Sequence, residues 1–286
     1  MLRIIGIALI AVGIFTPRIT HADLYSGPNE TTHPIDPAIL ANDSRFTQWA
    51  NQIDSNRTVF APRGSTVINQ IGGFNSLGDL DATQIASGMS PGYLTVTFPS
   101  GIRNGAGHDF AVFENGGAFL AAPLLFAELA YVEVSSNGSD FARFPSISLN
   151  RETDLAINFG RAFASLDTTK VFNLAGKHQT GFGTPFNLDD LTSDSLVNGG
   201  LLDLNNIQFL KLVDIPGNGA FKDSLGNSIF DAWLTTGGSG GFDFRLGPGL
   251  GVGVLNSIAA VPEPSSVALC LGVIAAVYVK RFQRKK

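Results

Sequence analysis

Short segments that alternate apolar and polar residues, separated by glycine-containing turns, constrain the fold of this chain most strongly. Residues 93–98 alternate apolar and hydroxyl side chains, which is typical of a half-buried strand. Further strands are predicted at residues 109–116, 131–136, 141–144 and 207–215, with a last strand through Val254. The 33 glycines lie between many of these segments and favour frequent turns. We therefore expect an all-β body, a β-sandwich or jelly roll, with one or two short peripheral helices.

Two local patterns refine this expectation. Asn137-Gly138 separates two apolar segments and predicts a β-hairpin with a type I′ turn, because both residues adopt positive φ readily. Asp43–Ile53 is the best candidate helix, since Phe46, Trp49, Ala50 and Ile53 follow the i, i+3, i+4, i+7 spacing. Residues 23–42 are polar and contain prolines, so residues 23–70 are interpreted as a leader that packs this helix on a body spanning 71–258.

The charge is distributed unevenly. Residues 23–260 carry 12 basic and 23 acidic side chains, a net charge of about −11. Such a body repels phosphates, which argues against a nucleic-acid partner and favours cations. The single cysteine, Cys270, lies in a C-terminal apolar run, so disulfides do not hold the body together.

The N-terminus has the pattern of a secretory signal peptide. Arg3 precedes an uncharged, mostly apolar stretch from Ile4 to Phe15, and Thr20-His21-Ala22 is a small-x-small cleavage site. The pattern predicts cleavage after Ala22. The alternative is a retained anchor, but twelve residues are too few to span a bilayer well.

The C-terminus, residues 261–286, has three parts in a fixed order. Pro262-Glu263-Pro264 comes first, a charge-free run follows from Ser265 to Val279, and a basic end closes the chain with Lys280, Arg281, Arg284, Lys285 and Lys286. As a helix, 265–279 rises about 22 Å, and the flanking lysine and arginine extend its reach across a membrane. The positive-inside rule then places the basic end in the cytoplasm and the body outside.

This three-part order with a literal Pro-Glu-Pro resembles the PEP-CTERM sorting signal of bacteria, also called the ice-binding protein C-terminal domain, a name that does not imply ice binding. The resemblance implies processing by an exosortase-type membrane protease and delivery to the cell surface or an extracellular polymer. The alternative is a plain single-pass anchor.

The body carries two weaker resemblances. Val132 to Gly138 resembles a hairpin of galactose-binding-like, discoidin-type sandwiches. A wider set of segments is similar to an uncharacterised group of bacterial cell-surface proteins, from which Phe244 to Gly247 departs; the similar segments are residues 76–79, 109–116, 173–176, 181–188 and 240–243.

Catalytic motifs are weak. His33, His108 and His178 lack a second histidine at i+3 or i+4 and are interpreted as surface or loop residues. Gly237 to Gly241 matches G-x-S-x-G around Ser239, but no amphipathic helix follows, so a flexible loop is the better interpretation.

Acidic residues grouped at predicted turns suggest a structural Ca²⁺ site, because Ca²⁺ prefers oxygen ligands. The candidate ligands are Asp109, Glu114, Asp223, Asp231 and Asp243. The alternative is that these side chains cap solvated turns.

Three classes of function remain open. The first is a non-catalytic surface or matrix protein that is adhesive or associated with polysaccharide. The second is a specific carbohydrate-binding module, for which only Trp49 and Trp233 are available as tryptophan platforms. The third is a secreted hydrolase with paired carboxylates.

Overall fold

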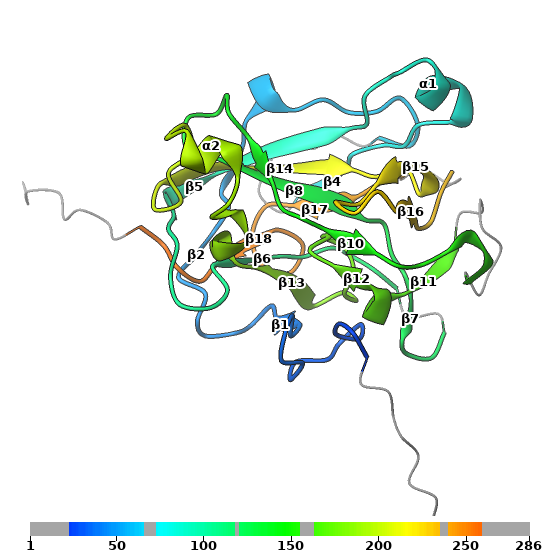
Figure 1. Cartoon of the computed structure of the whole chain (residues 1–286), viewed down its shortest axis with the longest axis horizontal. Helices are drawn as coiled ribbons and strands as arrows, with labels where there is room; N and C mark the ends of the chain where they lie inside the picture. The colour runs from blue at the N-terminus through cyan, green and yellow to red at the C-terminus, as the bar shows by residue number, and fades with distance from the viewer. Residues whose placement is uncertain (1–22, 66–72, 118–119, 155–162, 235–239, 259–286) are drawn as a thin grey trace, which may run out of the picture.

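The computed structural model describes residues 23–65, 73–117, 120–154, 163–234 and 240–258. Two five-stranded antiparallel sheets form two layers (Figure 1). The first sheet has the order β1 (Ile39–Leu40), β13 (Phe182–Phe186), β6 (Phe110–Val112), β18 (Val252–Val254) and β2 (Gln48–Trp49). The second has the order β3 (Gln52–Ile53), β5 (Tyr93–Ile102), β14 (Ile207–Asp214), β8 (Ala130–Ser135) and β9 (Ala142–Arg143). The all-β prediction is confirmed.

Smaller ribbons and single-turn helices complete the described parts. The two-stranded pairs are β4 (Phe74–Ser76) with β17 (Asp243–Arg245), β7 (Leu124–Phe126) with β11 (Ser165–Asp167), β10 (Ile147–Ser148) with β12 (Val171–Phe172), and β15 (Asn218–Lys222) with β16 (Ser228–Phe230). The α-helices are α1 (Ala82–Ala86) and α2 (Ser195–Asn198), and the 3₁₀ helices are η1 (Ser55–Arg57), η2 (Glu152–Asp154), η3 (Thr168–Lys170) and η4 (Leu188–Leu191). A capping box starts α1, because Asp81 accepts from the Gln84 amide and the Gln84 side chain accepts from the Asp81 amide.

Inward-facing residues of both sheets form the main core. Phe110 and Phe186 stack with ring centroids 5.2 Å apart, and Phe144 meets both rings edge-on at 5.7 and 5.1 Å. On β14, Leu210 and Leu212 face this core, and antiparallel partners on β5 and β8 hold them in register. Alternation along each strand therefore builds the interior as expected for packed sheets.

The predicted hairpin at Asn137-Gly138 exists, but its turn type was wrong. β8 and β9 pair through Glu133 with Arg143 and Val134 with Ala142, so the loop is longer than two residues. Gly138 has a positive φ of 75°, whereas Asn137 does not. Instead, the Asn137 side-chain oxygen accepts from the amides of Ser139 and Asp140, which is an Asx-type turn.

The predicted helix at Asp43–Ile53 was also wrong. This segment forms β2 at the edge of the first sheet and β3 at the edge of the second, so it passes from one sheet to the other. Phe46 and Trp49 pack against Phe113 on the outer side of the first sheet, while Ile53 enters the main core. The apolar residues share a helical spacing by coincidence, because they are buried in two different places.

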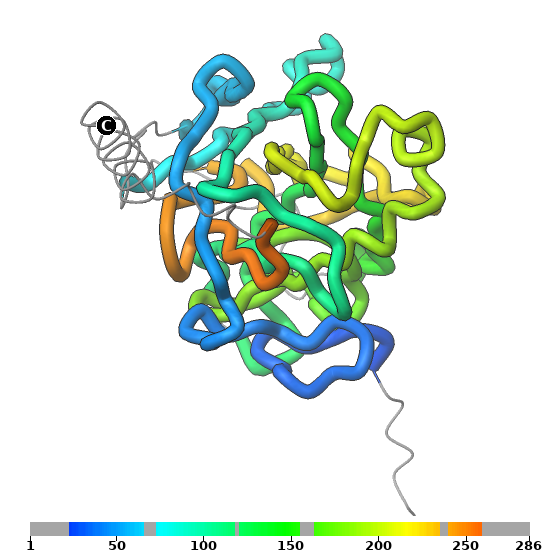
Figure 2. The backbone as a smooth tube through the Cα atoms, turned by 90° about the vertical axis from the view of Figure 1, so that its left-hand side faces the viewer, coloured from blue at the N-terminus to red at the C-terminus, as the bar shows by residue number. Residues whose placement is uncertain are grey.

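The leader is held against the body by specific contacts. Figure 2 shows residues 23–60, in blue, running along one side of the body from one layer to the other. Buried Lys177 donates to a carboxylate oxygen of Asp36 and to the Val171 carbonyl, and the Ser26 amide donates to the other Asp36 oxygen at 2.8 Å. A buried ion pair with additional hydrogen bonds therefore fastens the leader to the body.

Among the described residues, no helix has the length and apolar character needed to cross a membrane. The predicted signal peptide with Ala22, and the whole predicted tail with Pro262, Glu263, Pro264 and the basic end, lie outside the described residues.

The central strand gives a direct test of the core. Leu212 is fully buried, whereas Leu225 is 69% exposed in a turn. We expect Leu212→Ala to lower the free energy of unfolding by about 2–5 kcal/mol, because it leaves a cavity in a packed core. The same substitution at Leu225 should change it by less than about 0.5 kcal/mol. Urea unfolding of both variants measures the difference, and equal effects would contradict this packing.

Candidate functional site

Three buried carboxylates converge where the two sheets meet. Glu114 follows β6, Glu128 lies between β7 and β8, and Asp243 opens β17. One oxygen from each lies within 4.8 Å of the others, and the three residues are only 1%, 5% and 2% exposed. We call Glu114, Glu128 and Asp243 the carboxylate triad.

The members of the triad differ in their hydrogen bonds. Asp243 pairs with Ser76 across the β4–β17 ribbon and accepts from its hydroxyl, and it also accepts from the Asn115 side-chain amide at 2.7 Å. Both carboxylate oxygens of Glu114 are buried without a hydrogen-bond partner. A buried carboxylate without partners is costly, so Glu114 is poorly satisfied compared with Asp243.

Three more buried acids lie close to the triad. Asp214 accepts from the Phe242 amide at 2.8 Å, and Asp231 accepts from the Leu129 amide at 2.7 Å. The second oxygen of each, Asp214 Oδ2 and Asp231 Oδ1, has no partner. Asp79 accepts from the amides of Leu80 and Leu234. None of the six acids forms an ion pair with a described lysine, arginine or histidine.

Burial sets the protonation of these groups. Desolvation raises the pKa of Glu114, Glu128, Asp214 and Asp231 well above the ordinary range, and repulsion from neighbouring carboxylates adds to the rise. The backbone amides of Asn115 and Gly116 oppose the rise at Glu114, although neither forms a hydrogen bond with it. Desolvation also raises the pKa of Asp243, against its two hydrogen bonds, and that of Asp79 to about 6.

The sequence-predicted metal ligands separate into two groups. The structure brings Glu114 and Asp243 together and places Asp231 near them. Asp109 instead accepts from the Gly105 and Leu188 amides and from Asn256, so it joins three loops. Asp223 accepts from the amides of Leu225, Asn227 and Ser148 and closes a turn. Both residues therefore serve as backbone caps outside the triad.

Sequence reasoning missed Glu128. It stands alone as an acid in the apolar run Leu124 to Ala130. A single carboxylate within such a run is the sequence pattern that could have identified it, because charged residues are rarely buried without a specific partner.

The histidines were predicted to be surface or loop residues; His33 and His178 do lie in loops, but both are buried. His178 is fully buried, with one ring nitrogen 2.9 Å from the Ser26 hydroxyl and the other 3.1 Å from the Thr184 hydroxyl. Burial and the neighbouring Lys177 charge lower its pKa well below the usual value, so this ring stays neutral. His33 is also buried, beside Asp36. Ser239 lies outside the described residues.

The tryptophans take part in packing. Trp49 stacks near Phe113 with ring centroids 5.3 Å apart, and the Trp233 ring nitrogen donates to the Leu80 carbonyl at 3.0 Å.

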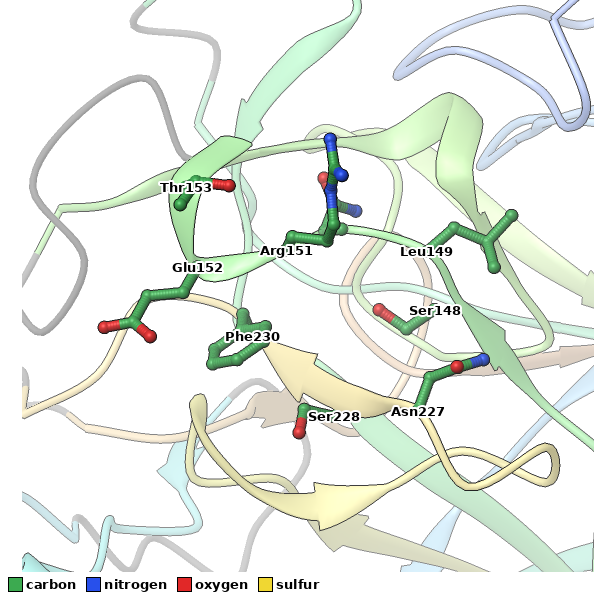
Figure 3. Close-up of a pocket in the computed structure, with 9 residues that line it drawn as sticks. Ser148, Leu149, Arg151, Glu152, Thr153, Asn227, Ser228 and Phe230 are labelled. Carbon is green, nitrogen blue, oxygen red and sulfur yellow. The ribbon is translucent and has the colours of Figure 1, made fainter.

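An open groove of about 490 Å³ lies between residues 148–153 and residues 227–230 (Figure 3). Its lining combines the Phe230 ring with hydroxyl, amide and charged side chains, among them Asn227, Ser228 and Arg151. The Ser148 hydroxyl also lines the groove and is buried without a hydrogen-bond partner. An aromatic ring beside polar groups is a surface that suits a small polar ligand.

No protein-family model matches this chain, and a comparison with curated proteins also finds no match. The candidate sites are therefore interpreted from their geometry and chemistry alone.

The raised acid pKa values predict the pH dependence of stability. An acid whose pKa is higher in the folded state favours folding below its unfolded pKa, and this contribution is lost as pH rises through the folded value. For Asp79 the window runs from about pH 4 to 6. The lowered pKa values of His108 and His178 act in the opposite direction over part of this range, but the raised acids outnumber them.

In buffer that contains a metal chelator, we therefore expect the melting temperature to fall as the pH rises from about 4.5 to about 7.5. Asp79→Asn should make this fall smaller. Melting temperatures of the parent protein and the Asp79→Asn variant, measured across this pH range, test the prediction. A rise of stability with pH, or an unchanged slope in the variant, would contradict the assignment.

Proposed function

We propose that this protein is a non-catalytic, exported cell-surface or extracellular-matrix protein. Its C-terminal tail directs sorting by an exosortase-type membrane protease, and the apolar helix 265–279 anchors it to the membrane before processing. The body associates with extracellular polysaccharide, and its finer fold is a galactose-binding-like jelly roll similar to the uncharacterised surface-protein group.

One observation carries the non-catalytic part of this proposal. The three carboxylates that converge lie in the interior, at most 5% exposed, whereas the open groove is lined by a single carboxylate, Glu152. A hydrolase needs its acid and base within reach of the substrate. This separation supports a binding or structural role over the hydrolase alternative.

The groove favours a second candidate function, a specific carbohydrate-binding module. Sugars stack an apolar face on aromatic rings and donate hydroxyls to nearby polar groups, and the groove offers Phe230 together with Asn227 and Ser228. This candidate differs from the first only in requiring one defined ligand.

The tail is tested by replacing Pro262-Glu263-Pro264 with alanines. We expect an uncleaved, membrane-retained form to accumulate, because the protease no longer recognises its motif. Replacing Ser265 and Ser266 with alanines is the matched control and should leave processing intact. Mass spectrometry and cell fractionation give the readout. Identical mass and location in mutant and parent would reduce the tail to a simple anchor.

The groove is tested by Phe230→Ala. We expect at least a tenfold loss of binding to extracellular polysaccharide from the producing cell, because stacked aromatic rings contribute much of the affinity in such sites. Leu201→Ala, which removes an apolar side chain that is 53% exposed after α2, should bind like the parent. Co-sedimentation measures both, and equal binding by both variants would exclude the groove.

A further inference from the structure

We propose that the carboxylate triad of Glu114, Glu128 and Asp243 is an enclosed structural binding site for one Ca²⁺ ion. The inference concerns the interior of the body and does not depend on how the tail is processed.

The spacing of the triad fits this ion. Calcium binds oxygen ligands at about 2.3–2.6 Å, so two ligands on opposite sides of the ion are about 4.6–5.2 Å apart. One oxygen of each of the three side chains lies within 4.8 Å of the others. The three carboxylates are therefore close enough together to share a single ion.

The surroundings of Glu114 indicate that this carboxylate lacks a binding partner. It is 1% exposed, and neither of its oxygens has a hydrogen-bond donor, although both lie in the interior. A fold that buries an acid normally supplies donors or an opposite charge, as it does for Asp36 with Lys177. No described lysine, arginine or histidine forms an ion pair with the triad. A cation between the three carboxylates provides the missing charge.

Gly116 leaves an oxygen-lined space beside Glu114. A Cβ atom at this position would lie 3.1 Å from the His178 carbonyl oxygen and 3.2 Å from both Glu114 Oε2 and the Phe126 carbonyl oxygen. Backbone carbonyls are common calcium ligands, and the Phe126 carbonyl also accepts from the Gly117 amide at 3.0 Å. The glycine keeps this space open.

Neighbouring groups hold one ligand in place. Ser76 and Asn115 each donate a hydrogen bond to a different oxygen of Asp243. Such outer hydrogen bonds orient a carboxylate ligand and leave its remaining lone pairs for a metal.

The chemistry favours Ca²⁺ over other divalent ions. The ligands are all oxygen, which disfavours Zn²⁺ with its preference for nitrogen and sulfur. The site is enclosed, whereas Mg²⁺ gives up its water shell reluctantly and usually keeps several waters. Ion binding requires the three carboxylates to be ionised, and a divalent ion then neutralises two of their three charges.

The first experiment measures binding to the full-length chain. After removal of metal with a chelator, equilibrium dialysis with Ca²⁺ should show one ion per chain, and Ca²⁺ at about one hundred times Kd should raise the melting temperature by about 5–10 °C. Mg²⁺ and NaCl at matched ionic strength should give less than a third of this shift. Absence of stoichiometric binding, or equal shifts with all three salts, would overturn the site.

Single substitutions test whether the ion binds at the carboxylate triad. Glu114→Gln, Glu128→Gln and Asp243→Asn keep the side-chain shape and should each abolish the Ca²⁺-dependent shift. Asp109→Asn and Asp223→Asn are matched controls, because these acids are buried but cap backbone amides elsewhere. Their own stability can fall, yet the Ca²⁺-dependent shift should stay. A shift that survives in the triad variants, or disappears in the controls, would refute the assignment.

Gly116→Ala gives a variant that retains all three carboxylates. Its methyl group fills the space beside Glu114 Oε2, so Ca²⁺ affinity should fall at least tenfold. Unchanged affinity would exclude the carbonyl oxygens of His178 and Phe126 from the site, and binding that persists in both this variant and Glu114→Gln would place the ion outside the triad.

Discussion

The hydrogen bonding of β14 along both of its edges determines the arrangement of the whole body. Its register with β5 and β8 turns Leu210 and Leu212 inward and leaves Lys211 on the outer face, where it pairs with Glu133 at 3.1 Å. A slip of one residue would exchange these faces and bury the lysine. The same register pairs Asp214 with Ala130, two residues beyond Glu128. The register of this strand therefore sets the position of Asp214 relative to Glu128.

A strand could be predicted from the sequence where one of its faces is buried and the other exposed, because its residues then alternate between apolar and polar. Tyr93–Ile102 and Ile207–Asp214 are long enough to show alternation, and both predictions are confirmed. The helix prediction around Trp49 failed because the apolar residues are divided between the outer side of the first sheet and the main core, which no local periodicity can encode. The way the leader is held on the body could not be predicted for a related reason. It depends on the contact of Asp36 with Lys177, which lies 141 residues further along the chain.

The candidate site was predictable only in part. The excess of acids in the body indicated carboxylates near one another, and Glu114 and Asp243 were among the named residues. Their convergence arises from pairing between β4 and β17 and from the path of the chain between β7 and β8, which are long-range features. Turn composition alone could not separate them from Asp223, whose oxygens are fully used by nearby amides. Acidic turns that look alike in sequence thus differ in whether their carboxylates are bonded to backbone amides or remain available to bind a metal ion.

The place of β18 in the first sheet has a consequence for how the chain acquires its structure. β18 lies between β6 and β2, so residues near position 50 and position 112 are joined by a strand at position 253. Neither half of the sequence contains a complete five-stranded sheet. Such non-local pairing makes folding slow, because long loops must close before their contacts form. Almost the entire body must therefore be synthesised before the first sheet can close.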